Sequence, residues 1–198
     1  MELLVAIISG YLLGSVSFGI IVTKWLRGVD IRQYGSGNTG MTNVMRTIGK
    51  GPAVLVLLGD ALKGAVSVGI GLSMGSTVYA VIAGLAAMAG HTYPLFHGFR
   101  GGRGVATGFG VILTLTPDVT LIALFIFFAI VFFTRYVSLG SILAASSVPL
   151  TMTILEKPLP ILLFGVLGAG FVIYRHKENI KRLLNGTEYK IGGEIRRD

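Results

Sequence analysis

The stretch VTLIALFIFFAIVFFT, residues 119–134, carries no charged side chain and is almost wholly apolar. About 20 such residues, with a usual range of 17–25, span the hydrocarbon core of a bilayer. Thr116-Pro117-Asp118 separates this stretch from an earlier apolar run at 102–116. The two runs therefore form either a hairpin of two short spans or one kinked helix.

Apolar runs of spanning length also occur on both sides of this pair, at residues 3–23, 52–74, 77–96, 138–155 and 158–174. Hydrophobic residues make up 53% of the 198-residue chain and charged residues only 13%, whereas a soluble domain carries about 25% charged residues. The 29 glycines suit close helix contacts in lipid. The first run has no basic residue before it, so a retained helix is expected rather than a signal peptide.

Basic residues decide between the hairpin and the kinked helix. With a hairpin, 15 of the 17 Lys and Arg residues fall on one side of the membrane. One kinked helix would instead put Arg100 and Arg103 on the opposite face from Arg135. Because Lys and Arg favour cytoplasmic loops, the sequence predicts an all-α integral membrane protein with seven transmembrane helices, its N-terminus outside and its C-terminus cytoplasmic. A single membrane domain is expected over 1–198, with 175–198 as a cytoplasmic or interfacial tail that begins with a short helix ending at Leu184.

The first inner polar segment is GSGNTGMTNVMR, residues 35–46. Three glycines within six residues allow the backbone to turn and expose N–H groups. Polar side chains add hydrogen-bond donors, and Arg46 adds a planar cation. These components are typical of a phosphate-binding loop, although a flexible loop with turn residues has the same composition.

Two further inner segments contain cations. Arg100 and Arg103 lie among glycines in FRGGRGVATG, residues 99–108, which indicates anion binding or a purely topological role. In YRHKENIKR, residues 174–182, His176 and Asn179 are three residues apart and share a helix face. A solvated basic face against lipid headgroups is the alternative there.

Four other polar residues have both a structural and a functional interpretation. Asp60 and Lys63 lie inside the second apolar run, where a charge at the bilayer centre costs roughly 2.5–3.5 kcal/mol. They are three residues apart and can form a structural ion pair on one helix face, or Lys63 can face a substrate. His91 is either a capped structural histidine or part of a site, and Ser141 is either a packing serine or a donor at a helix mouth.

Some chemistry is absent from the sequence. There is no H-x-x-x-x-D acyltransferase motif, no G-x-S-x-G elbow, no H-E-x-x-H motif and no Walker A loop. The chain has no cysteine and three histidines, so neither a metal nor a cofactor is expected. The formal charge of +8 is divided among loops between apolar runs, which favours anionic ligands and membrane lipid over nucleic acid.

Five blocks together resemble the bacterial acyl-phosphate:glycerol-3-phosphate acyltransferases, the PlsY family, over about residues 14–187. In chain order they are GSGNTGMTNVMR (35–46), DALKG (60–64), GHTYPLFHGFRGGRGVATGFG (90–110), RYVSLGS (135–141) and YRHKENIKRLLNGTE (174–188). The resemblance implies transfer of a fatty acyl group from acyl phosphate to the 1-hydroxyl of sn-glycerol 3-phosphate, giving lysophosphatidate and phosphate. It also implies seven helices in the bacterial inner membrane, a cytoplasmic active site and no cofactor, and we expect a monomer.

The resemblance assigns roles to individual residues. Those expected to hold acyl phosphate are Ser36, Gly37, Asn38, Gly40, Thr42 and Asn43. Those expected to hold glycerol 3-phosphate are Arg46, Lys63, Arg103, Ser141, His176 and Asn179. The expected catalytic set is Ser36, Asn38, Arg46, His91, Arg103, His176 and Asn179. Two departures from the family pattern are Arg at 100 and 103, where Lys is common, and Met41, where Ala is usual.

The proton acceptor stays open at this stage. His176, His91 or the phosphate of the substrate could take the proton of the acceptor hydroxyl, and an acyl-Ser36 intermediate is the covalent alternative. Two rival functions also remain: a small organophosphate transporter, and an acyltransferase that uses acyl-CoA or an acyl carrier protein. Polar groups gathered in inner loops rather than at the midplane argue against the transporter.

Overall fold

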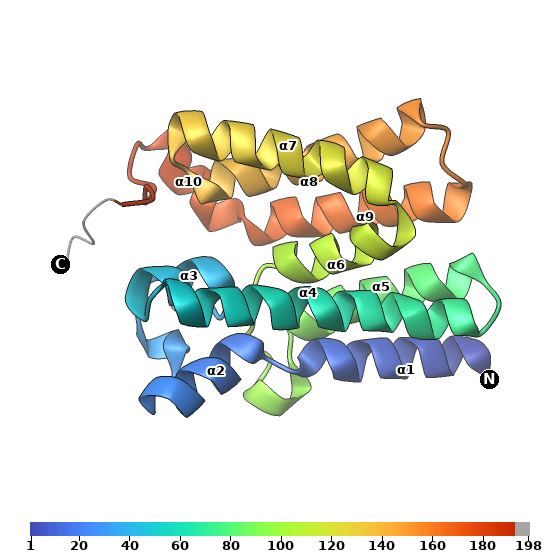
Figure 1. Ribbon diagram of the computed structural model, residues 1–198, viewed down its shortest axis with the longest axis horizontal. Coiled ribbons are helices and arrows are strands. Elements are labelled where there is room, and N and C mark those ends of the chain that lie inside the picture. Colours follow the sequence, from blue (N-terminus) through green and yellow to red (C-terminus); the bar gives the residue numbers. More distant parts are fainter. Residues whose placement is uncertain (193–198) are drawn as a thin grey trace. The chain divides into compact units, whose positions relative to one another are not determined.

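The computed structural model describes residues 1–192, and the regular elements in this range are all helical (Figure 1). Residues 193–198, which include Arg196 and Arg197 of the expected tail, lie outside the described residues. The chain divides into two compact units at Thr116 and Pro117, and each unit is described by itself.

The first unit contains four long or medium helices and four short elements. They are α1 (Glu2–Ser15), α2 (Phe18–Arg27), the 3-10 turn η1 (Ile31–Gln33), α3 (Met41–Thr47), α4 (Lys50–Ser73), α5 (Thr77–Thr92), the 3-10 turn η2 (Leu95–His97) and α6 (Val105–Leu115). Helix α4 packs against α1, α5 and α6, and α1 also packs along α5. A Cβ added at Gly14 would lie 2.2 Å from the Ala87 carbonyl oxygen, so these two backbones approach as closely as small residues permit.

The second unit contains α7 (Pro117–Thr134), α8 (Val137–Ile154), α9 (Leu159–Arg175) and α10 (Lys177–Leu184). Helix α8 packs against both α7 and α9, and α10 contacts α8 and α9. The short tail helix predicted to end at Leu184 is confirmed, although it begins at Lys177 after a bend of 59° from α9.

Within residues 1–192, five segments are long and apolar enough to cross a membrane: Glu2–Arg27, Lys50–Ser73, Thr77–His97, Pro117–Thr134 and Val137–Ile154. Taking α9 with α10 gives a sixth. Helix α6 has 11 residues, about 16 Å, which is shorter than the roughly 30 Å hydrocarbon core. The structure thus supports the all-helical class with five or six spans, whereas the sequence predicts seven.

Two helix boundaries differ from the sequence prediction. The first apolar run is not one continuous helix, because Val16 and Ser17 adopt extended backbone angles between α1 and α2. The Val16 carbonyl accepts a hydrogen bond from Lys63 Nζ on α4, 2.7 Å away, so the interruption has a partner from another helix. The run expected from 102 becomes helical only at Val105, because the preceding glycines fold back over the end of α5.

A cluster of buried apolar side chains fixes the segment between α2 and α4. It consists of Ile20, Val22, Ile31, Val44, Ala53 and Val56. Met41, which stands where the resembled family usually has Ala, is partly buried against this cluster. The larger side chain therefore packs into the core beneath the glycine-rich segment.

Candidate active site

The glycine-rich segment 35–46 folds around the side chain of Asn43, which is 2% exposed. Its Nδ2 donates hydrogen bonds to the carbonyls of Tyr34 and Asn38, each at 2.9 Å. Its Oδ1 accepts a hydrogen bond from the Ser36 backbone N–H at 3.0 Å. Gly35 has φ of +58°, and a Cβ there would lie 2.3 Å from Asn43 Oδ1. Asn43 thus holds the loop from inside, and glycine is required at 35.

The remaining predicted donors are arranged along the outer side of this loop. Asn38 Oδ1 accepts a hydrogen bond from the Gly40 N–H at 2.8 Å, which closes the turn before α3. Ser36 is exposed, while Thr42 and Arg46 are half-buried on α3. The sequence correctly predicts a turn-forming loop rich in polar groups.

Asp60, Lys63 and His91 form a buried polar cluster below the loops of the first unit. Lys63 Nζ lies 2.8 Å from Asp60 Oδ1 and 2.9 Å from His91 Nδ1. The three side chains are 1%, 3% and 4% exposed. The predicted ion pair on one helix face is confirmed, and His91 is added to it from the last turn of α5.

The second cationic segment folds back over the end of α5. The Gly101 N–H donates to the Thr92 carbonyl and the Gly102 N–H donates to the His91 carbonyl, both at 3.1 Å. A Cβ at Gly102 would lie 2.0 Å from His91 Nε2, so the ring edge packs directly on this glycine. Arg103, the next residue, is half-buried, whereas Arg100 is exposed. His91 therefore fixes the backbone that carries Arg103.

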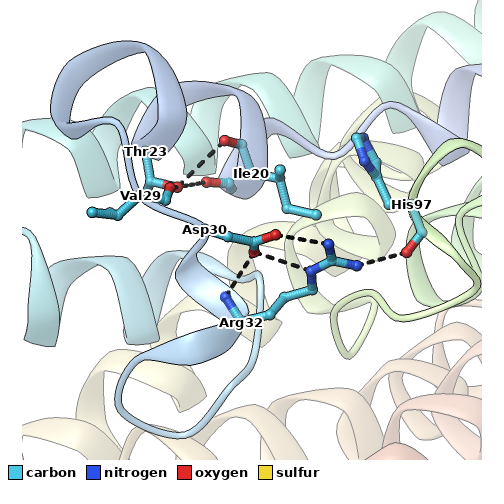
Figure 2. Close-up of polar contacts among 7 residues, drawn as sticks. Ile20, Thr23, Val29, Asp30, Arg32 and His97 are labelled. Atoms are coloured by element: carbon cyan, nitrogen blue, oxygen red, sulfur yellow. Dashed lines mark hydrogen bonds and ion pairs between the residues drawn. The ribbon is translucent and has the colours of Figure 1, made fainter.

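Asp30 and Arg32 connect the segment before the glycine-rich loop to the segment before Arg103 (Figure 2). Arg32 Nε and Nη2 donate to the two Asp30 carboxylate oxygens at 3.0 and 2.7 Å. Arg32 Nη1 donates to the His97 carbonyl at 2.7 Å, across 65 residues of sequence. The side-chain hydrogen bonds from Arg32 lower the pKa of Asp30 to about 2. This bidentate pair links η1, just before the glycine-rich loop, to η2, just before Arg103.

Of the predicted site residues of the second unit, Asn179 contacts a carboxylate that sequence reasoning missed, Glu188. Glu188 Oε1 accepts hydrogen bonds from Asn179 Nδ2 at 2.7 Å and from Ser138 Oγ at 2.8 Å, and Arg182 Nε donates to Glu188 Oε2 at 2.7 Å. The Glu188 side chain is 5% exposed. The sequence signal that could have indicated Glu188 is its place just after the Asn185-Gly186 turn, at the end of the block 174–188.

His176 and Ser141 are also buried in this unit, at 2% and 5% exposure. His176 Nδ1 lies 2.8 Å from the Val172 carbonyl oxygen, which favours a proton on Nδ1 and leaves Nε2 as the acceptor nitrogen. His176 lies at the junction of α9 and α10, Asn179 in the first turn of α10, and Ser141 near the start of α8. Within residues 1–192, no group of three His, Asp or Glu side chains is placed to hold a metal ion.

The apolar helices and polar loops define a polytopic, all-helical integral membrane protein. A family model for glycerol-3-phosphate acyltransferase matches residues 4–186, and the chain therefore belongs to that family. A glycerol-3-phosphate acyltransferase of Syntrophomonas wolfei is 54% identical over 181 residues, covering 91% of this chain and 93% of that protein. Another, from a Synechococcus strain, is 48% identical over 189 residues, covering 96% and 94%.

Two solved structures are similar to this chain over almost its full length. Both are crystal structures of PlsY, an integral membrane glycerol 3-phosphate acyltransferase, and both share 41% identity with this chain. The glycerol 3-phosphate form has a TM-score of 0.91 and covers 96% of each chain. The lysophosphatidic acid form has a TM-score of 0.89 and covers 96% of this chain and 95% of that one.

Proposed function

We propose that the protein moves a fatty acyl group from acyl phosphate to the 1-hydroxyl of sn-glycerol 3-phosphate, producing lysophosphatidate and inorganic phosphate. The observation that carries this proposal is a glycine-rich loop with accessible Ser36 and Arg46, tied by Arg32 to the loop of Arg103. Such an arrangement suits a donor and an acceptor that both carry phosphate. The glycerol 3-phosphate and lysophosphatidic acid forms of the similar structures support the acceptor and the product.

The donor side of the site is the loop 35–46. We assign the phosphate of acyl phosphate to the backbone N–H groups and side chains of this loop, namely Ser36, Gly37, Asn38, Gly40 and Thr42, with Asn43 holding the loop in shape. Neutralising this phosphate makes it a better leaving group. A donor aimed at the developing oxyanion of the attacked carbonyl is worth about 2.7–4 kcal/mol in enzymes of this kind.

The acceptor side needs cations and an acceptor for the hydroxyl proton. For glycerol 3-phosphate we keep the set that the family resemblance implies: Arg46, Lys63, Arg103, Ser141, His176 and Asn179. Lys63 stays in the acceptor set as an indirect contributor, because its Nζ already lies within 2.9 Å of the Val16 carbonyl oxygen, Asp60 Oδ1 and His91 Nδ1. Holding both reactants in place converts the reaction into an effectively unimolecular step.

The chemical step is a direct transfer. The acceptor oxygen forms a bond to the acyl carbon, the bond from that carbon to the phosphate oxygen breaks, and phosphate leaves with the electron pair. The hydroxyl proton goes to His176 Nε2, to His91 or to the departing phosphate. A covalent acyl-Ser36 route would need a base beside Ser36, and trapping a stable acyl-Ser36 would replace the direct route.

The same proposal includes the membrane arrangement. We place seven helices in the bacterial inner membrane, with α6 as the short fourth span, the N-terminus outside, and the loops of Arg46, Arg103 and His176 in the cytoplasm. The positive-inside count of 15 among 17 basic residues supports this orientation. We propose that the monomer is the active species.

Phosphate release from the purified, detergent-solubilised protein tests this function. Palmitoyl phosphate is supplied with and without glycerol 3-phosphate, and palmitoyl-CoA replaces it in a parallel reaction. We expect acceptor-dependent phosphate release and lysophosphatidate with palmitoyl phosphate only, and loss of both in Arg103→Ala. Equal turnover with palmitoyl-CoA would assign another donor. Transport of glycerol 3-phosphate into proteoliposomes without acyl transfer would make the protein a transporter.

A further inference from the structure

Lys63 Nζ has three close polar neighbours, two in hydrogen bonds and one in an ion pair. Nζ lies 2.7 Å from the Val16 carbonyl oxygen, 2.8 Å from Asp60 Oδ1 and 2.9 Å from His91 Nδ1. These neighbours come from the α1–α2 interruption, from α4 itself and from α5. A lysine ammonium has three donors and no acceptor. The ammonium therefore requires His91 Nδ1 to be the unprotonated nitrogen.

This requirement determines the tautomer of His91. A neutral imidazole whose Nδ1 accepts carries its proton on Nε2. The competing arrangement, with a proton on Nδ1 directed to Asp60 Oδ1 at 3.4 Å, would bring that proton against the Lys63 ammonium. Asp60 is 1% exposed and supplies the counter-charge for the Lys63 ammonium in this buried position.

The Nε2 side of the ring faces the segment that carries Arg103. A Cβ on Gly102 would lie 2.0 Å from Nε2, and the Gly102 N–H donates to the His91 carbonyl. The orientation of the ring and the path of residues 101–103 are therefore one structural unit. Rotation of the ring would displace Gly102, and Arg103 is the next residue along the chain.

We propose that Asp60 and Lys63 are positioning residues that hold His91 in its neutral Nε2–H tautomer, packed beneath Gly102, and thereby set the position of Arg103 for the acceptor phosphate. In this tautomer Nε2 already carries a proton and Nδ1 is taken by Lys63, so His91 is not the general base and the hydroxyl proton goes to His176 or to the departing phosphate. The second half of this inference rests on the proposed function, because it assumes that Arg103 holds glycerol 3-phosphate. The tautomer does not depend on it.

Nitrogen-15 NMR of histidine-labelled protein in micelles tests the tautomer directly. The chain has three histidines, and the His91 signals are those lost in His91→Gln. We expect the nitrogen-15 shift of an unprotonated Nδ1 and of a protonated Nε2 at pH 7. A protonated Nδ1 overturns the proposal. This spectrum is read without turnover, so its result is independent of whether the protein transfers acyl groups.

The positioning role is tested with D60N/K63M, which removes both charges and keeps similar side-chain volumes. We expect a folded protein in which the tautomer of His91 is no longer fixed and KM for glycerol 3-phosphate rises about tenfold, the effect of one lost charge-assisted hydrogen bond, with a much smaller change in kcat. The matched control is D118N/K157M, which removes the exposed Asp–Lys pair of the second unit, and we expect an unchanged KM there.

Two results would contradict the positioning role. One is a folded D60N/K63M protein with an altered His91 spectrum and the KM of the wild type. The other is an equal rise of KM in D118N/K157M. If D60N/K63M does not fold, Asp60→Asn alone is measured by the same criteria, since it keeps an oxygen acceptor beside Lys63. A wild-type protein that releases no phosphate with glycerol 3-phosphate would refute the proposed function and leave the tautomer result standing.

Discussion

Asn43→Asp is the substitution for which the structure gives the clearest expected cost. The amide Nδ2 donates to the Tyr34 and Asn38 carbonyls, each at 2.9 Å, and the Ile31 carbonyl oxygen lies 3.4 Å away. Aspartate keeps the acceptor for the Ser36 N–H but replaces the donor by an oxygen. That oxygen would face three carbonyl oxygens in a place where the side chain is 2% exposed.

The magnitude follows from these contacts. Two lost hydrogen bonds are worth about 1 kcal/mol each, and leaving their buried acceptors unpaired adds about 1–3 kcal/mol. We therefore expect Asn43→Asp to lower the stability of the folded loop by about 3–5 kcal/mol at neutral pH, which is enough to open the loop locally without unfolding the helices. Below the pKa of the new carboxyl, its protonated form donates one hydrogen bond, so part of the loss should be recovered at low pH.

Hydrogen–deuterium exchange of peptides covering residues 34–46, together with thermal unfolding in detergent, measures this effect. The matched control is Asn38→Asp, because Asn38 Oδ1 acts as an acceptor for the Gly40 N–H and a carboxylate keeps that role. We expect fast exchange in N43D and near wild-type exchange in N38D. Equal protection of the loop in both variants would refute the argument that Asn43 holds it through its donors.

Three further predictions concern the other polar clusters. Arg32→Lys cannot keep both the bidentate hydrogen bonds to Asp30 and the hydrogen bond to the His97 carbonyl. KM measured by steady-state kinetics should therefore rise for both substrates together. A rise of KM for one substrate alone would contradict the coupling of the two loops. The folded-state pKa of Asp30 is lowered from 3.8 to about 2, so its contribution to stability is fully present above pH 3.8 and is lost as the pH falls through 2. After allowance for solvent screening, the free energy of unfolding of wild type should exceed that of Asp30→Asn by about 1–2 kcal/mol between pH 5 and 8. The two free energies should converge near pH 2 in unfolding experiments. Glu188→Gln weakens the hydrogen bonds from Ser138, Asn179 and Arg182 to a buried carboxylate and should lower the free energy of unfolding by about 2–4 kcal/mol. Thermal unfolding is compared with that of Glu178→Gln, which changes an exposed glutamate of α10. Equal unfolding of the two variants would contradict this role of Glu188.

Sequence patterns were sufficient where the determining contacts are local. Apolar runs predict the long helices, since a span depends on its own length and hydropathy. The spacing of Asp60 and Lys63 predicts their ion pair, because residues three apart share a helix face. The short helix before Asn185 follows in the same way from its stop signal.

Contacts between distant parts of the chain could not be predicted in this way. The interruption at Val16 depends on Lys63, 47 residues later, and the first apolar run itself contains no proline that would indicate it. The bond from Arg32 to His97 spans 65 residues, so the pair with Asp30 looks like an ordinary loop ion pair in the sequence. Glu188 appears there as a tail carboxylate, and only the fold brings it against Ser138, 50 residues earlier.

The Val16 carbonyl, at the break between α1 and α2, also bears on how the chain enters the membrane during synthesis. Hydrocarbon offers no water to satisfy a backbone oxygen, so a first span standing alone in lipid would have to hide this group by other means. Its partner, Lys63, belongs to the next long helix and is itself too costly to leave exposed to lipid. Each of the two segments therefore carries a polar group that forms a hydrogen bond with the other. We infer that the two segments leave the insertion machinery as a pair, with the Lys63 ammonium already hydrogen-bonded to the Val16 carbonyl.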